Sequence, residues 1–172
     1  LKADVRALAA EIDLRTAASA VVAASLAAML VTAIGGEAGS VAVAAFNGPS
    51  NTVISGERDA VERLVDAMKG AGIDARMLRI SFASHSPMVE PAVGPFRNVM
   101  AGLRWAPPRT ALISNLTGDL AGPAELASGD YWTRHMRQPV RFADSIRTMA
   151  AQGITHCIEV RPHPVLMGMG AE

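Results

Sequence analysis

The chain has 172 residues, half of them hydrophobic, and its 16 basic residues balance its 16 acidic ones. This length supplies one hydrophobic core, or one core with a small satellite. The balanced charge and the aromatic content of 4% argue against a nucleic acid or an anionic membrane as the main partner.

A single cysteine, Cys157, rules out an internal disulfide within the sequence and a cysteine-based zinc site. This usage is typical of a reducing compartment and predicts a cytoplasmic protein. Cys157 lies in the apolar run "HCIEV", so it is predicted to be a small buried residue. No spacing of His, Cys, Asp and Glu resembles a metal site.

The first 39 residues are predicted to be helical. Residues 3–12 carry apolar side chains at helical spacing, and residues 18–36 form an alanine-rich apolar run. The run is about as long as a membrane span, but it lacks aromatic anchors. A buried helix is the better interpretation, and the absence of a preceding basic region argues against a signal peptide.

The next 40 residues change pattern at Ser40. Short β-type runs over 41–46 and 52–56 flank a turn, "NGPSN", and an amphipathic helix over 57–72 precedes a strand over 73–81. This β-β-α-β order predicts a two-layer, ferredoxin-like unit with its helix on one face of the sheet.

The remaining residues alternate between helical and strand patterns. An amphipathic helix is expected over 88–103, a short strand over 111–115, and helices from residue 130 and over 141–153. The hydrophobic run over 154–162 is typical of a strand buried in a parallel sheet. Together these patterns predict an α/β layer.

The stretch "SFASHSPMVEP" places His85 between Ser84 and Ser86. If His85 is a catalytic base, its nucleophile should come from elsewhere, because neighbouring residues in a strand point to opposite faces. His156 and His163 are interpreted as structural.

Four stretches together resemble the acyltransferase domains of modular polyketide synthases and the malonyl transacylases of fatty-acid synthesis. They occur in that family's order: 44–56 ("AAFNGPSNTVISG"), 80–91 ("ISFASHSPMVEP"), 130–146 ("DYWTRHMRQPVRFADSI") and 158–166 ("IEVRPHPVL"). The resemblance implies an α/β fold, with part of an α/β-hydrolase-like subdomain and a ferredoxin-like small subdomain. The expected division is 1–39 as a helical segment of the large subdomain, 40–80 as the small subdomain, and 81–172 as the C-terminal part of the large one.

The resemblance also implies a reaction, in which an acyl group passes from coenzyme A to a serine and then to the phosphopantetheine thiol of an acyl carrier protein. The expected partners are the acyl-coenzyme A, the acyl carrier protein and neighbouring synthase domains, without a bound cofactor, nucleic acid or membrane. On this resemblance His85 is the general base, and the backbone carbonyl of His135 orients it.

Phe82 and Ser84 fall where the family's acyl pocket lies. "FASH" (82–85) resembles the Y-A-S-H version linked with methylmalonyl more than the H-A-F-H version linked with malonyl. Ala24 aligns loosely with an arginine that binds the malonyl-type carboxylate. The expected preference is therefore methylmalonyl first, malonyl second and an uncarboxylated starter third.

The family's nucleophile motif, G-x-S-x-G, does not occur in the sequence, and "GPSNT" is the nearest approach, with Thr52 in place of the second glycine. Two hypotheses remain open. Either the chain is part of an acyltransferase whose serine lies on other sequence, or it is a catalytically dead remnant that serves as a structural or carrier-protein docking module.

Overall fold

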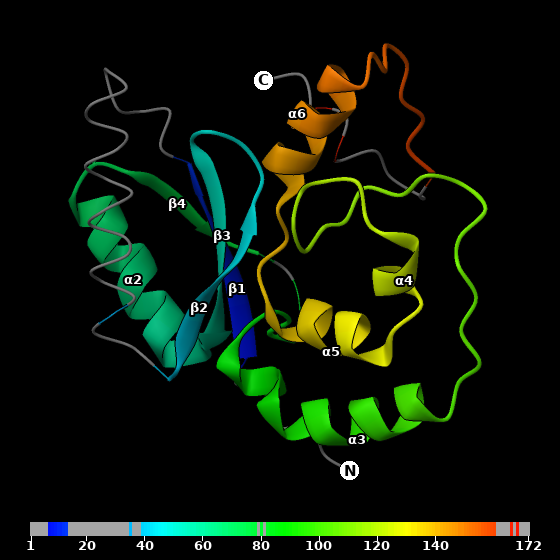
Figure 1. Cartoon of the computed structure of the whole chain (residues 1–172). Helices are drawn as coiled ribbons and strands as arrows, with labels where there is room; N and C mark the ends of the chain where they lie inside the picture. Colours follow the sequence, from blue (N-terminus) through cyan, green and yellow to red (C-terminus); the bar gives the residue numbers. More distant parts are fainter. Residues whose placement is uncertain are drawn as a thin grey trace.

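The computed structural model of the chain describes residues 7–13, 35, 39–78, 80, 82–160, 166 and 168. A sheet with one helix lies beside a second group of helices (Figure 1). The strands are β1 (Ala7–Asp13), β2 (Val41–Phe46), β3 (Asn51–Glu57) and β4 (Asp74–Met77). The helices are α2 (Arg58–Gly70), the single 3₁₀ turn η1 (Pro87–Val89), α3 (Glu90–Ala101), α4 (Pro123–Leu126), α5 (Gly129–Arg137) and α6 (Phe142–Ala151).

The four strands form one antiparallel sheet in the order β2-β3-β1-β4. Together with helix α2 between β3 and β4, this is the strand arrangement of a ferredoxin-like unit. Its register is continuous between β1 and β3, from Ala7 opposite Glu57 to Asp13 opposite Asn51. The α/β fold expected from the sequence is therefore confirmed.

Strand β1 corrects the sequence prediction of a helix over 3–12, since Ala7–Asp13 is a central strand of the sheet. The segment fits both patterns, because Leu8, Ala10 and Ile12 also alternate with a period of two. Pairing with β3 and β4 decides between them. Residues 7–13 are thus a strand of the four-stranded sheet and not the helical segment that was predicted. Apart from Gly35, the helix predicted over 18–36 lies outside the described residues.

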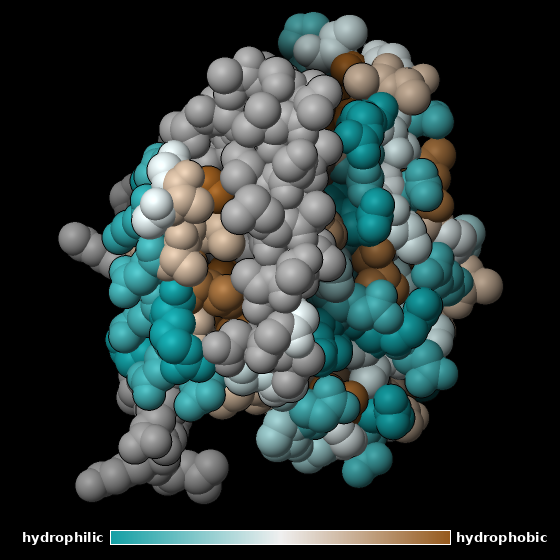
Figure 2. Space-filling model, turned by 90° about the vertical axis from the view of Figure 1, so that its left-hand side faces the viewer, coloured by the Kyte–Doolittle hydropathy of each residue, from teal (hydrophilic) through white to brown (hydrophobic). Residues whose placement is uncertain are grey.

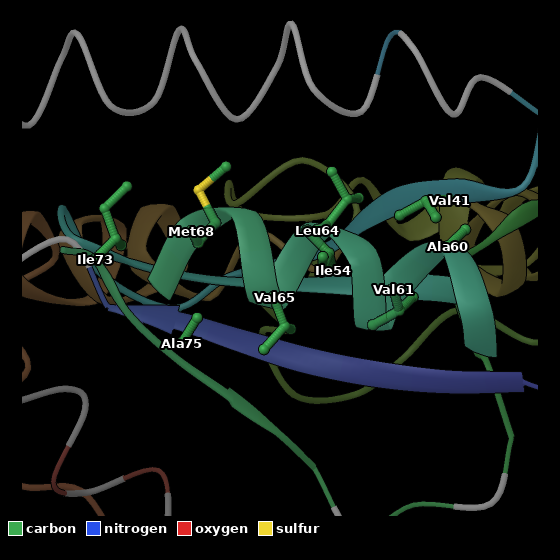
Figure 3. Close-up of a cluster of buried hydrophobic side chains, with 9 residues drawn as sticks. All are labelled: Val41, Ile54, Ala60, Val61, Leu64, Val65, Met68, Ile73 and Ala75. Carbon is green, nitrogen blue, oxygen red and sulfur yellow. The ribbon is translucent and has the colours of Figure 1, made fainter. Parts of the chain in front are cut away.

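Helix α2 covers one face of this sheet and closes the main hydrophobic core (Figure 3). Its apolar side chains recur at positions 61, 64, 65 and 68, which places them on one side of the helix. Gly72 follows with φ of 77°, a conformation that glycine adopts without a steric penalty. The buried cluster consists of Val41, Ile54, Ala60, Val61, Leu64, Val65, Met68, Ile73 and Ala75.

The second group of elements packs around helix α5. Helix α3 lies against α5, and a smaller buried cluster forms from Leu116, Leu126 and Tyr131. The strand predicted over 111–115 is reduced to an isolated bridge between Ile113 and Leu120. Residues 116–129 contain the single turn α4.

Two backbone hydrogen bonds join the groups. The Phe46 N–H donates to the Val140 carbonyl oxygen, and the Val140 N–H donates to the Ala44 carbonyl oxygen, each over 2.8 Å. They form a short parallel bridge between the edge strand β2 and the segment after α5. The C-terminal end of α5 is thereby fixed beside the sheet.

Residues 154–160 correct a second prediction, because they form no strand and lie exposed. Ile158 and Val160 are 90% and 91% exposed, and Cys157 is exposed where a buried residue was predicted. A buried strand requires a neighbour to satisfy its N–H and C=O groups, and no described strand pairs with this segment. The mainly parallel layer predicted over 81–172 is likewise not formed by the described residues.

On the face shown in Figure 2, the coloured side chains are mostly hydrophilic, and hydrophobic ones appear in small, separate patches. Among the helices described, none has the length and apolar content needed to cross a membrane.

Candidate active site

His85 lies in a tight turn between the sheet and η1. Ser86 fixes this turn: its hydroxyl donates to the Ala83 carbonyl oxygen over 2.8 Å and accepts from the Met88 N–H over 3.1 Å. Ser86 is fully buried, and its hydroxyl caps the first turn of η1. It therefore acts as a structural clamp and is not placed to act as a nucleophile.

The turn holds His85 in a left-handed backbone conformation, with φ of 60°. Non-glycine residues rarely adopt this region. Where they do, the surrounding structure holds them there, and many of these residues lie at functional sites. The conformation sends the imidazole away from the turn toward the C-terminal end of α5.

The His85 ring meets the backbone of Gln138, with 2.7 Å between Nδ1 and the Gln138 carbonyl oxygen. A carbonyl oxygen can only accept, so Nδ1 carries the proton and donates it. The neutral ring then has its lone pair on Nε2, which is the state of a general base. The carbonyl dipole also favours the imidazolium that forms when Nε2 takes up a proton.

The sequence explains why Gln138 presents its carbonyl here. Gln138 follows the last residue of α5, and Pro139 follows Gln138. A residue before proline is pushed out of the helical region, and Gln138 is extended with ψ of 156°. Its carbonyl consequently leaves the direction of the helix axis, while the bridge at Val140 holds the segment in place.

The carbonyl partner corrects the sequence prediction, which assigned this role to His135. His135 lies inside α5, where carbonyl groups point along the helix axis. Pro139, which directly follows Gln138, was the signal that could have identified Gln138.

His135 is nevertheless part of the site through its side chain. Its ring centroid is 5.8 Å from that of His85, and the two planes stand at 84°. On its other sides the ring lies 6.1 Å from Tyr131 and 6.2 Å from Trp132. Burial first, and the charge of His85 second, lower the pKa of His135 below its usual value of 6.5.

The two residues expected to line the acyl pocket precede His85 in the same turn region, Ser84 directly and Phe82 by three residues. Phe82 is 63% exposed and Ser84 is partly exposed, so both are open to a ligand that approaches the imidazole. His156 is not part of this site. It is exposed, and its ring contacts the hydroxyl of the neighbouring Thr155. His163 lies outside the described residues, and within the part of the chain that is described no three His, Cys, Asp or Glu side chains gather as a metal site.

Comparison with known proteins identifies the family. The family model "Acyl transferase domain" matches residues 6–172. A polyketide synthase of Streptomyces halstedii, GfsA, is 40% identical over 138 residues, which are 80% of this chain and 2% of that protein. A Mycobacterium tuberculosis relative, whose name reads "Putative inactive phenolphthiocerol synthesis polyketide synthase type I Pks1", is 42% identical over 128 residues, or 74% of this chain and 8% of that protein.

Solved structures agree with this match. The acyltransferase domain from the second module of the salinomycin polyketide synthase has a TM-score of 0.83 and 33% identity, and it covers 96% of this chain. The chain spans 36% of that structure's length and only a few per cent of the synthases named above. From these matches, the chain belongs to the acyl transferase domain family, with relatives among the polyketide synthases.

Proposed function

We propose that this chain carries the general base of an acyltransferase that loads acyl units from coenzyme A onto an acyl carrier protein. The observation that carries the proposal is the 2.7 Å contact between His85 Nδ1 and the Gln138 carbonyl oxygen. It leaves the Nε2 lone pair of the neutral ring available, which is the requirement for activating a hydroxyl or thiol.

The proposed reaction has two halves. In the first, Nε2 of His85 takes the proton of a serine hydroxyl, whose oxygen attacks the thioester carbonyl. The carbon–sulfur bond then breaks, and the imidazolium gives the proton to the leaving coenzyme A sulfur, which departs as the thiol. In the second half, the phosphopantetheine thiol gives its proton to Nε2 and attacks the acyl-serine. The serine oxygen leaves with that proton, and the acyl group is now a thioester of the carrier protein.

The serine of this scheme is assigned to sequence outside the 172 residues, since the chain contains no G-x-S-x-G motif. Ser86, the buried neighbour of His85, is committed to the turn. Incubated alone with an acyl-coenzyme A, the chain should gain no covalent acyl group in intact-mass spectrometry.

The proposed acyl group is methylmalonyl first, malonyl second and an uncarboxylated starter third. Ser84 supports this order, because its small side chain next to His85 leaves room beside the α-carbon of the substrate. A phenylalanine there would fill that room. One methyl group in a pocket is worth only about 1–3 kcal/mol, so the expected preference is modest.

Replacing His85 tests the base. In the acyltransferase domain that contains these residues, His85→Ala should slow formation of the acyl-enzyme by roughly 10²–10⁴-fold, the usual share of general-base catalysis. The measurement is the rate of self-acylation from radiolabelled acyl-coenzyme A. His156→Ala is the control, because His156 is exposed and should leave the rate unchanged. Equal rates for His85→Ala and the parent domain would remove His85 from the chemistry.

Replacing Ser84 tests the pocket. The domain is offered methylmalonyl-, malonyl- and acetyl-coenzyme A in competition, and the acyl-enzymes are quantified by mass spectrometry. Ser84→Phe should shift the ratio toward malonyl by roughly 10- to 100-fold, as expected for a filled methyl pocket. Ser84→Ala is the matched control, since it removes the hydroxyl without adding volume. An unchanged ratio in Ser84→Phe shows that position 84 does not set specificity.

A second candidate function is a non-enzymatic module that docks a carrier protein. The missing G-x-S-x-G motif favours it, as does the relative whose name describes it as inactive. The self-acylation assay separates the two functions. A domain that binds carrier protein and takes no acyl group from any of the three thioesters is a docking module.

A further inference from the structure

The last turn of α5 and the residue that follows it supply two contacts to His85. The Gln138 carbonyl fixes Nδ1, and the side chain of His135, three residues earlier, lies edge-on beside the same ring. The carbonyl contact explains the tautomer of His85. The His135 imidazole does not affect that tautomer, so its close approach to the His85 ring needs a separate explanation.

The His135 ring is held by aromatic packing. Tyr131 lies one turn earlier on the same helix with ring planes 26° apart, and Trp132 meets the His135 ring at 62°. Tyr131 is buried, and 2.9 Å separates its hydroxyl from that of Ser114. Trp132 is stacked on Trp105 at 6.3 Å. The position of the His135 ring is therefore fixed relative to the turn that holds His85.

We propose that the His135 imidazole is a positioning residue that stays neutral beside His85, so that the two rings together carry at most one positive charge. The role of His85 as a base rests on the proposed function, but the coupling of the two rings is independent of it. Two imidazolium rings at 5.8 Å would repel each other, and the packed aromatic side chains shield them poorly from that repulsion. A neutral ring imposes no such cost on the imidazolium that His85 forms in each half of the reaction.

Burial against the aromatic rings also favours the neutral form of His135. It removes water from around the ring and lowers the pKa of His135, and the charge of His85 lowers it further. The two effects act in one direction. His135 accordingly remains uncharged at pH values where an exposed histidine takes up a proton.

Other charged groups near α5 are engaged elsewhere. On α3, Glu90 pairs with Arg137 over 3.4 Å, and on α4, Glu125 pairs with Arg134 over 3.4 Å. The turn η1 contains no charged residue. The remaining ionisable groups on α3 and α5 are Arg97 and Asp130, which are exposed, and the buried Tyr131, whose hydroxyl is hydrogen-bonded with that of Ser114. Among the described groups, His85 is thus the titratable partner whose charge lowers the pKa of His135.

The coupling is tested by proton NMR titration of the histidine Cε1–H signals of the chain. The titration midpoint of His135 should rise in His85→Gln, which removes the positive charge and keeps a polar side chain of similar length. It should not move in His156→Gln, the control at an exposed histidine. An unchanged His135 midpoint in a folded His85→Gln variant overturns the proposal. If amide spectra show that His85→Gln is unfolded, His85→Asn replaces it.

The consequence for catalysis is tested by the pH profile of self-acylation in the complete domain. His135→Lys places a permanent cation beside His85, so it should move the acid limb to lower pH and lower the plateau rate. His135→Asn keeps the position neutral and should leave the acid limb in place. Identical profiles for Lys and Asn overturn the proposal. A domain with no self-acylation at any pH contradicts the proposed function instead, and the NMR result then stands alone.

Discussion

His85 is, among the described residues, the non-glycine residue with a positive φ. Its left-handed conformation is supported by the buried Ser86 clamp, and it turns the ring toward the Gln138 carbonyl. The strained backbone conformation and the hydrogen bond to the Gln138 carbonyl therefore both belong to His85. A conformation that costs free energy is maintained where it aims the proposed base.

The conformation predicts the sign of a stability difference. His85→Ala and His85→Gly both remove the ring, so the difference between them isolates the backbone. The glycine variant should be more stable by about 1 kcal/mol, because the left-handed region costs an L-residue roughly 1–2 kcal/mol. The measurement is the free energy of unfolding in urea.

Asn98 provides the control, since it is exposed inside α3. There the order should reverse, with Asn98→Ala about 1 kcal/mol more stable than Asn98→Gly, as helix propensities require. If alanine is also the better residue at position 85, the left-handed turn does not form.

The sequence was sufficient to single out His85 but not its partner. A histidine within a recognisable stretch stands out by residue type, whereas a backbone carbonyl has no residue type. Its location depends on where α5 ends, and that end is set by Pro139. Packing of the His135 ring against Tyr131 and Trp132 was equally hidden, although all three lie within one five-residue stretch of α5.

At the scale of elements, the spacing of apolar residues predicted secondary structure correctly where it fitted only a helix or only a strand. Helix α2 and strands β2 and β3 follow the predicted ranges closely, because their apolar spacing matches one period only. Strand β1 was misread because its alanine-rich segment fits a helix and a strand alike. Its identity is decided by hydrogen bonds to β3 and β4, which are distant in sequence.

The loop before α4 docks onto α6 through a glycine. Gly118 has φ of 81°, and a Cβ added to it would clash with the Cβ of Asp144. The Gly118 carbonyl oxygen accepts a 2.7 Å hydrogen bond from the Thr148 hydroxyl. This close approach joins α6 to the loop that precedes α4.

Gly118→Ala should therefore destabilise the chain by more than its backbone conformation alone explains. Gly153 is the matched control, because it has φ of 75° and nothing within 4 Å of an added Cβ. Gly153→Ala should cost about 1 kcal/mol for the conformation, whereas Gly118→Ala should cost roughly 1–3 kcal/mol more for overpacking. Urea unfolding of both variants gives the comparison, and equal losses would show that the loop does not contact α6.

At the scale of the whole molecule, some hydrophobic residues are buried and others are exposed, and composition does not reveal which. The hydrophobic residues around α2 are buried, whereas Ile158 and Val160 in the hydrophobic run over 154–160 are exposed. A hydrophobic run is buried only where other strands or helices meet it, and sequence pattern reports the run without its neighbours. This is the physical reason why the predicted parallel layer is missing from the described residues.

Substitution of one buried and one exposed isoleucine tests this difference in burial directly. Ile54 is fully buried in the core beneath α2, and Ile158 is 90% exposed. Ile54→Ala should lower the free energy of unfolding by about 2–5 kcal/mol, from lost transfer free energy and the cavity left behind. Ile158→Ala should change it by about 0.5 kcal/mol or less, as for an ordinary surface position. Because the two substitutions are chemically identical, differences in side-chain type cancel. A loss of several kcal/mol in Ile158→Ala would mean that residues 154–160 are packed in the chain, as their sequence pattern alone predicts.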